Sequence, residues 1–257
     1  MGSHKTGSDT GFARDGLMSA ASSVNGAKSK HGRKRGSGVA VVYETLRREI
    51  IDLTLAPGSP IDEVQLSERF EMSRTPVREA LVRLAAENLI TILTNRATVV
   101  SQIDFVNMPA FFDALTLMYR VTTRGAAENR TEADLEKIRK LQAAFARSVD
   151  SSDALEMIST NRDFHYGIAE AGRNKYYINL FAQLLDDGLR ILRLYYSSFN
   201  DELPREYVTE HDDLIDAIAR QDVEAADALA LAHADQIVKQ IQSYVAADRR
   251  TSTGLAL

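Results

Sequence analysis

Apolar side chains in residues 61–88 recur every three or four positions, which predicts two short amphipathic helices that share one apolar side. Only residues 71–73 separate the two helices, so their connection is a tight turn. Thr75 before Pro76 is typical of a helix start, because a proline at the first helical position loses no hydrogen bond. Ser73 is the alternative cap if the helix begins earlier. The positions that define the shared side are Leu66, Phe70, Val77, Leu81 and Leu84.

The second of these helices has arginines away from its apolar side. When Val77 and Leu81 face inward, side chains near the outward face or the helix start remain free for contacts with another molecule. Guanidinium groups bind phosphates and guanine edges, so such a helix suits the major groove of DNA. An ordinary helical hairpin with a solvated basic face remains the alternative from this pattern alone. The predicted DNA contacts on this helix are Arg74, Thr75, Arg78 and Arg83.

The flanking segments predict a winged helix–turn–helix over residues 39–103. Residues 39–54 have one apolar side and are stopped by the Ala-Pro-Gly-Ser-Pro run at 56–60, so a first helix completes a three-helix core. Residues 89–93 and 98–100 are rich in β-branched side chains and predict a two-stranded wing. Arg96, at the tip of this wing, is a further predicted DNA contact.

Residues 104–247 have helical periodicity throughout, which predicts an antiparallel all-α bundle of six or seven helices. The fold class is therefore mostly α. Residues 1–38 are rich in Gly, Ser and Lys without any period, and they predict a disordered basic tail; residues 248–257 predict a disordered C-terminus. The helices of the bundle are expected near 106–128, 132–149, 152–171, 174–198, 204–220 and 222–246.

Charge is divided unevenly along the 257 residues, whose formal net charge is −5. Residues 1–38 hold seven Lys/Arg against two Asp/Glu, and residues 39–103 hold seven against nine. Most of the acid thus lies in the predicted bundle, and DNA binding has to depend on local arginine placement. The chain has no cysteine, no apolar run that spans a bilayer and no secretory signal pattern. We therefore expect a cytoplasmic protein that does not bind a membrane.

Three histidines lie in the predicted bundle on three different helices: His165, His211 and His233. Asn161 precedes His165 by four positions, so the two share a helix face. Neutral imidazole nitrogens bind zinc, nickel and similar ions, so convergence of the three would make a site for a divalent transition metal. Spacing alone favours three separate, hydrogen-bonded core histidines over such a site.

The run from Val42 to Ile90, with SRTPVREAL at 73–81 as its most specific part, resembles the winged helix–turn–helix of GntR-family transcription regulators. The resemblance continues to about residue 245 and implies the FadR-like branch, which has an all-helical FCD ligand domain. Two turn positions depart from the family pattern, because Glu71 and Ala97 stand where glycine is usual. Since glycine serves where φ is positive, both turns should be strained or differently shaped.

The FCD resemblance implies that NRDFH, EHDDL and LAHAD contain the metal ligands Asn161, His165, His211 and His233. Families of this type commonly have aspartate where this chain has Asn161, whose carbonyl brings no negative charge, so weaker metal binding is expected. The effector is expected to be an organic acid on or near the metal. Leu115 and Tyr119 stand where the family often has Arg and Glu, which implies a less polar pocket. Candidate effector contacts are Arg120, Arg124, Arg190, Arg193, Tyr195 and Tyr196.

The sequence thus predicts a ligand-responsive transcription regulator, acting as a repressor, that binds a near-palindromic double-stranded operator as a homodimer. A metal-dependent enzyme that uses the three histidines is one alternative, but no HExxH, GxSxG or phosphate-binding glycine loop accompanies them. A helical module that binds protein instead of DNA is the other. Arg74 and Arg78 distinguish these possibilities, because only the regulator needs them.

Overall fold

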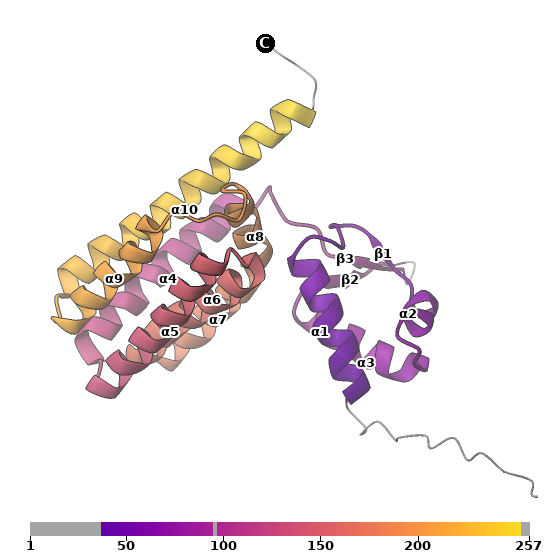
Figure 1. The fold of residues 1–257 in the computed structure, drawn as a ribbon, viewed down its shortest axis with the longest axis horizontal. Coiled ribbons are helices and arrows are strands. Elements are labelled where there is room, and N and C mark those ends of the chain that lie inside the picture. The colour runs from indigo at the N-terminus through magenta and orange to yellow at the C-terminus, as the bar shows by residue number, and fades with distance from the viewer. Residues whose placement is uncertain (1–36, 95–96, 253–257) are drawn as a thin grey trace, which may run out of the picture. The chain divides into compact units, whose positions relative to one another are not determined.

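The computed structural model describes residues 37–94 and 97–252, and within them the chain is mostly helical (Figure 1). Ten helices and three short strands occur in these ranges. The strands all lie before residue 101, and the described residues after it form helices and connections only. The predicted fold class, a winged helix–turn–helix followed by an all-α bundle, is confirmed.

The winged part is built on α1 (Ser37–Ile51), α2 (Glu63–Arg69) and α3 (Arg74–Ala86). Helix α2 begins where the Asp62 carboxylate accepts hydrogen bonds from the backbone N–H groups of Val64 and Gln65, at 2.7 and 3.2 Å. Helix α3 begins after Ser73, so the earlier of the two predicted starts is used, although the Ser73 side chain makes no capping bond. The fully buried side chains of this core include Val42, Leu46, Ile50, Val77, Ala80, Leu84 and Val100.

The turn between α2 and α3 has the unusual backbone that the glycine-to-glutamate departure predicted. Glu71 adopts φ +51°, in the left-handed region that favours glycine. The Met72 N–H donates to the Ser67 carbonyl at 3.0 Å and closes the turn. The strain at Glu71 is therefore confined to one residue, and the helix–turn–helix geometry is kept.

The wing contains one strand more than the sequence predicted. Strands β2 (Ile90–Ile92) and β3 (Thr98–Val100) pair antiparallel, with Ile90 opposite Val100. Strand β1 (Pro60–Ile61), which follows the proline-rich connection, pairs antiparallel with the other edge of β3, so the order is β1-β3-β2. The predicted tip residue Arg96 lies outside the described residues.

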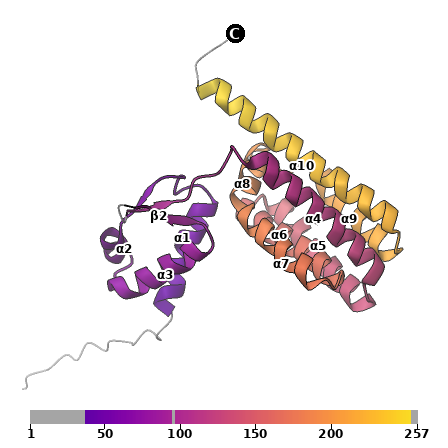
Figure 2. The ribbon, with the colours of Figure 1, turned by 180° about the vertical axis from the view of Figure 1, so that it is seen from behind.

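Seven helices make up the described residues of the C-terminal part. Two views show that the last helix lies along the first helix of this part over much of its length (Figures 1 and 2). None of the helices in the described ranges is long and apolar enough to cross a membrane. The seven are α4 (Met108–Asn129), α5 (Glu132–Ser151), α6 (Ala154–Ala171), α7 (Lys175–Asp187), α8 (Leu189–Ser197), α9 (Glu206–Ala219) and α10 (Val223–Ser252).

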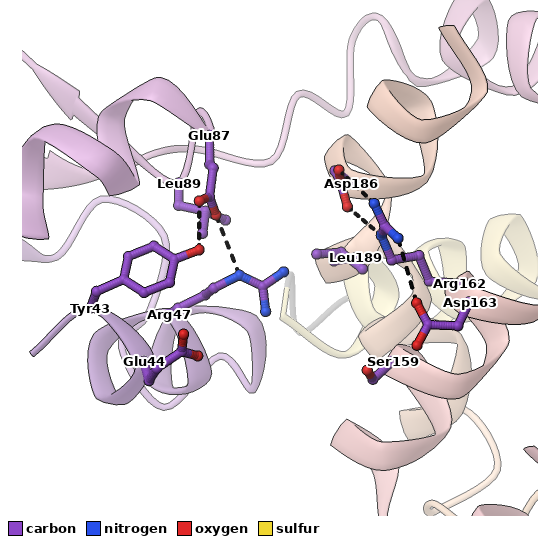
Figure 3. Close-up of a pocket in the computed structure, with 10 residues that line it drawn as sticks. All are labelled: Tyr43, Glu44, Arg47, Glu87, Leu89, Ser159, Arg162, Asp163, Asp186 and Leu189. Atoms are coloured by element: carbon purple, nitrogen blue, oxygen red, sulfur yellow. Dashed lines mark hydrogen bonds and ion pairs between the residues drawn. The ribbon is translucent and has the colours of Figure 1, made fainter. Parts of the chain in front are cut away.

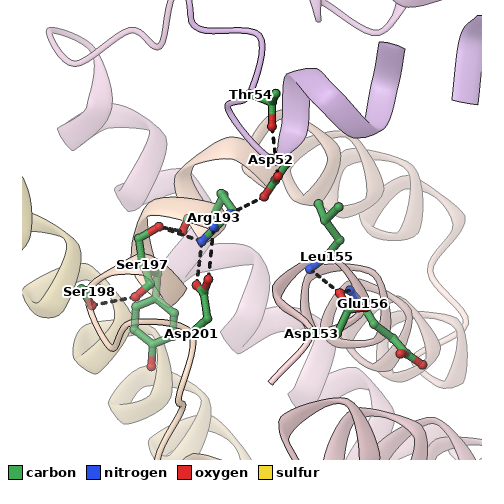
Figure 4. Close-up of polar contacts among 10 residues, drawn as sticks. Asp52, Thr54, Asp153, Leu155, Glu156, Arg193, Ser197, Ser198 and Asp201 are labelled. Atoms are coloured by element: carbon green, nitrogen blue, oxygen red, sulfur yellow. Dashed lines mark hydrogen bonds and ion pairs between the residues drawn. The ribbon is translucent and has the colours of Figure 1, made fainter. Parts of the chain in front are cut away.

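Polar side chains fix several helix starts in the bundle. Thr131 and Asp134 form a reciprocal capping box at the start of α5. The Asp153 carboxylate accepts hydrogen bonds from the N–H groups of Leu155 and Glu156, at 3.1 and 3.0 Å, and starts α6 (Figure 4). These caps set where α6 begins, and so where its buried polar residues fall.

Two helix boundaries differ from the prediction. The single helix expected over 174–198 is interrupted at Gly188, giving α7 and α8. A Cβ at Gly188 would lie 3.1 Å from Cζ of Phe111 and 3.1 Å from the Leu184 carbonyl oxygen, so the chain passes close to α4 and a side chain there would require these neighbours to shift by a few tenths of an ångström. Periodicity does not reveal such a close approach. Helix α10 also continues to Ser252, past the end predicted at 246.

Candidate functional site

Helix α3 presents the predicted DNA contacts on one exposed side. Val77, Ala80, Leu81 and Leu84 are buried against the winged core, so the intervening positions face outward. The side chains of Arg74, Thr75, Arg78 and Arg83 are all exposed. The arrangement leaves polar groups at the first two turns of α3, which is the part of a reading helix that contacts base edges.

Two of these arginines already have partners within the winged part. Arg78 Nε lies 2.7 Å from Glu63 Oε2, at the start of α2. Arg83 lies over the ring of Tyr43, with its Cζ 3.9 Å from the ring centroid. The Tyr43 hydroxyl donates to Glu87 at 2.5 Å, and Arg47 donates to the same carboxylate at 3.3 Å (Figure 3). Arg83 thus contributes to packing between α1 and α3.

The bundle brings the three predicted histidines together. His165 lies on α6, His211 on α9 and His233 on α10, and all are buried. One ligand atom from each lies within 4.8 Å of the others. The ring centroids are 4.9 to 5.2 Å apart. Asn161, one turn before His165, is 4% exposed, so it is buried on the same helix.

Hydrogen bonds orient two of the imidazoles. His211 Nδ1 lies 3.0 Å from Gln142 Oε1, and the Gln142 amide nitrogen donates to the Val208 carbonyl at 2.9 Å. Because that amide nitrogen is used, Oε1 accepts from an Nδ1–H, and the lone pair of His211 is on Nε2. His233 Nδ1 lies 2.9 Å from the Glu210 carboxylate and donates to it in the same way. Histidines that coordinate a metal commonly donate their other ring N–H to a partner of this kind, which orients the imidazole.

Gln142 and Glu210 are functional candidates that the sequence analysis did not identify. Gln142 could have been found as a polar residue on the otherwise apolar side of α5, between Ile138 and Phe145. Glu210 directly precedes His211, yet it contacts His233, which is 23 positions away in the chain. Spacing gives no indication of that contact, because it depends on how α9 packs against α10.

Aromatic side chains pack around the buried cluster. Phe164 stacks on His211, with ring centroids 4.2 Å apart, and Tyr119 meets His165 edge-on at 4.6 Å. Burial holds the pKa of His165 well below its ordinary value of 6.5, and the neighbouring His233 lowers it further. Burial likewise lowers the pKa of His211. These imidazoles are therefore neutral at pH 7, as metal ligands must be.

Three buried polar atoms of the site have no hydrogen-bond partner among the described residues: Asn161 Nδ2, His165 Nε2 and His233 Nε2. Leaving a buried polar group without a partner costs about 1–3 kcal/mol, so such groups normally have one. The imidazoles of the three histidines can each direct a lone pair at a divalent transition metal, and Asn161 can add its amide oxygen, whereas its Nδ2 is a donor that needs a different partner. The donor set thus fits the metal that the sequence predicted.

The low pKa values of His165 and His211 predict a loss of stability in acid for the metal-free protein. The unfolded chain takes up protons below about pH 6.5 while the folded sites resist them, so stability present above that value is lost as the pH falls. Each of these two histidines should contribute a loss on the order of 1 kcal/mol at about pH 5.5. Urea unfolding of chelator-treated protein at two pH values measures this. His211→Gln should show a smaller loss, and equal pH dependence in both proteins would contradict the prediction.

The predicted effector contacts lie in several places. Arg120 donates to Asp227 at 3.0 and 2.8 Å, and Arg124 lies 4.0 Å from the same carboxylate. Arg193 donates hydrogen bonds to the Ser197 hydroxyl and the Asp201 carboxylate, each at 2.7 Å (Figure 4). Arg190, Tyr195 and Tyr196 are buried in α8. Their roles as effector contacts stay predictions.

A mainly apolar cavity lies beside the histidine cluster. Its wall includes Asn161, and also Tyr119, whose ring contacts His165 and His233. Within the described residues, none of the six predicted effector contacts is part of this wall. The remaining lining residues are Phe111, Phe112, Leu115, Arg162, Leu184, Leu185, Gly188, Leu189, Ile191, Leu192, Ile237 and Ile241.

Comparisons with known proteins agree with both parts of this arrangement. Residues 38–100 match the bacterial regulatory proteins of the gntR family, and residues 111–236 match the FCD domain. The chain is 30% identical over 212 residues to the HTH-type transcriptional regulator LutR of Bacillus subtilis, covering 74% of this chain and 94% of that protein. It is 25% identical over 207 residues to the HTH-type transcriptional repressor RspR of Escherichia coli, covering 78% and 87%.

Solved structures show the same fold. Escherichia coli McbR/YncC superposes with a TM-score of 0.66 at 24% identity, covering 81% of this chain and 99% of that one. A transcriptional regulator GntR from Rhodococcus sp. RHA1 gives a TM-score of 0.64 at 21% identity, covering 80% and 97%. The match to the gntR family, the likeness to LutR and the exposed arginine-bearing helix together define a DNA-binding transcription regulator. The chain belongs to the GntR family, whose members here are regulators and not enzymes, and its C-terminal part is an FCD domain.

Proposed function

We propose that this protein is a repressor that binds a near-palindromic operator as a homodimer and responds to a small organic acid through a metal in its FCD domain. The observation that carries the proposal is the combination of an exposed α3, with Arg74 and Arg78 outward, and a buried cluster of three histidines. The name of RspR, a transcriptional repressor, favours repression. The all-helical bundle favours the FadR-like branch, and DNA as partner implies the cytoplasm.

Selection of DNA from a random pool by the purified full-length chain tests the DNA-binding part. We expect one enriched sequence with two inverted half-sites about one helical turn apart, because two copies of α3 would enter successive major grooves. A pool without enrichment at moderate salt would contradict sequence-specific binding. A single unrepeated half-site would instead contradict the homodimer.

The metal is the second part of the proposal. His165, His211 and His233 would each supply a ring nitrogen, and the Asn161 carbonyl oxygen would supply a neutral fourth ligand. Zinc and nickel both suit imidazole ligands. The absence of an anionic ligand should weaken binding relative to a site that contains aspartate. When bound, the ion would supply a Lewis-acidic position for a carboxylate.

An exposed apolar face on α4 and α7 supports the homodimer. Leu117 on α4 is 55% exposed, and Leu180 and Tyr176 on α7 are 54% and 68% exposed. Val121 and Tyr177 line one groove, so the two helices share this face. Clusters of exposed apolar side chains usually mark an interaction site. A second copy of the chain fits it, because a two-fold axis would bring the same apolar face against itself.

Introducing charge on this face should separate the protomers. Leu117→Glu with Leu180→Glu would place four carboxylates in the proposed interface, and we expect the double variant to sediment as a monomer in analytical ultracentrifugation. Its affinity for an operator with two half-sites should fall at least about tenfold, because the second contact becomes intermolecular. Val106→Glu is the matched control, since Val106 is 87% exposed and lies outside this face. A double variant that remains dimeric would place the interface elsewhere.

The effector is proposed to act on the dimer. Binding beside the histidine cluster would change which arrangement of the two protomers is favoured, and thereby whether both copies of α3 match the spacing of the half-sites. A ligand can shift this equilibrium only by the difference in its affinity for the two arrangements. The direction of the response is the release of DNA, as expected for an effector-relieved repressor.

A further inference from the structure

The cavity beside the histidine cluster has one polar end and an apolar remainder. Ten of its lining side chains are Phe, Leu or Ile, and they come from α4, α7, α8 and α10. Its charged lining residue, Arg162, donates to Asp186 at 2.6 and 3.1 Å, so its charge is already paired (Figure 3). The polar groups left to meet a ligand are therefore the amide of Asn161 and the ring hydroxyl of Tyr119.

Asn161 lines the cavity and lies on the same helix as His165 of the cluster. It lies one turn before His165 on α6, it is 4% exposed, and its Nδ2 has no hydrogen-bond partner among the described residues. Only the amide oxygen can bind a metal ion, because the amide nitrogen has no available lone pair. If a metal occupies the cluster, the amide turns its oxygen toward the metal, and the NH₂ group then faces away from it, where the cavity lies.

From this arrangement we propose that Asn161 donates a hydrogen bond to the carboxylate of the effector, and that the effector is a monocarboxylate with an apolar body. The inference rests on the metal site of the proposed function. One carboxylate oxygen would bind the metal and the other would accept from Asn161. An aspartate at this position could only accept hydrogen bonds and would repel the same carboxylate. Asn161 thus weakens the metal site and makes the cavity selective for an anion.

The charge balance of the cluster supports a monoanion. Three neutral imidazoles and a neutral amide leave the two positive charges of a divalent metal without a directly bound anion. The nearby carboxylate of Glu210 accepts a hydrogen bond from His233 and offsets one of them from a distance. A monocarboxylate would supply the other. A second carboxylate on the ligand would be buried among leucines and phenylalanines without a partner, which disfavours dicarboxylates.

The cavity has to widen to admit such a ligand. Its volume is about 30 Å³, which is room for roughly one or two water molecules. The lining side chains Leu115, Leu184 and Leu192 are only partly buried, so they can change rotamer without disturbing a fully packed core. Burial of the ligand's apolar body would then give a negative heat-capacity change on binding.

Calorimetric titration of the zinc-loaded protein with hexanoate and with adipate tests the inference, because the two acids have the same number of carbons. We expect hexanoate to bind at least about tenfold more tightly than adipate. Asn161→Asp should weaken hexanoate binding at least about tenfold while zinc is held as tightly or more tightly. The opposite direction of these two changes would not follow from a general loss of structure.

Asn174→Asp is the matched control, because it makes the same chemical change at the start of α7, where a carboxylate can accept the same backbone hydrogen bonds. It should change neither zinc nor hexanoate binding. Zinc binding together with equal affinities for the two acids, or unchanged hexanoate binding by Asn161→Asp, would overturn the inference and leave the metal site intact. A wild-type protein that fails to bind zinc would overturn the metal site of the proposed function, and the inference with it.

Discussion

Replacing both Arg74 and Arg78 with alanine is expected to abolish specific DNA binding while the protein remains folded. Both side chains are exposed on the first two turns of α3, and neither contributes to the buried core of the winged part. An arginine that contacts a base or a phosphate contributes about 1–3 kcal/mol to binding, and a dimer presents each arginine twice. The loss should therefore reach at least about a hundredfold, measured by fluorescence anisotropy with the selected operator.

The matched control for this variant is Arg139→Ala with Arg147→Ala, which removes two exposed arginines from α5. It changes the net charge by the same amount, so it tests whether charge alone explains the effect. Its DNA affinity should stay within about threefold of the wild type, because these residues lie outside the winged part. Equal losses in the two variants would show that α3 does not read the operator.

Replacing His211 with alanine is expected to remove the metal. Protein purified without a chelator or a nickel column should contain about one zinc or nickel ion per chain, measured by plasma mass spectrometry. In the proposed site His211 would supply one of the three imidazoles, and with the neutral Asn161 as the remaining ligand the loss of one imidazole should release the ion at micromolar concentration. The variant should contain less than about a tenth of the wild-type amount.

Gln142→Leu tests whether metal binding depends on the orientation of the His211 imidazole, because the imidazole itself is retained. It keeps all three imidazoles but removes the group that holds His211, so metal affinity should fall about 10–100-fold. His31→Ala, in the part of the chain outside the described residues, is the control and should keep the full metal content. If the wild-type chain binds no ion, the histidine cluster is not a metal site, and the unpartnered nitrogens need another explanation.

Much of the fold follows from the sequence because the buried apolar side chains of a helix repeat at a regular spacing along the chain. Val77, Leu81 and Leu84 repeat as a helix requires, and all three are buried. The substitution of glutamate for glycine at position 71 predicted an unusual turn, and Glu71 indeed has a positive φ. The third strand was missed because Pro60 and Ile61 form a pair too short to have a period.

The candidate site was predictable only in part, for a different reason. The convergence of His165, His211 and His233 follows from a resemblance, since spacing alone left separate histidines open. The partners of these histidines depend on helix packing, which brings Glu210 to His233. Likewise, the contact of Arg83 with Tyr43 joins residues 40 positions apart. Such contacts join residues that are distant in the chain, so the sequence around either residue does not reveal its partner.

The close approach at Gly188 has a practical consequence for redirecting the response of this protein. Gly188 lines the cavity, so it would be a natural target for a library of effector-specificity variants. A Cβ there would lie 3.1 Å from Phe111 Cζ and 3.1 Å from the Leu184 carbonyl oxygen, so variation at this position requires these neighbours to shift and is expected to cost stability. Leu115, Leu184 and Leu192 border the same space and are only partly buried, so a library that varies these three while position 188 stays fixed should retain more folded clones.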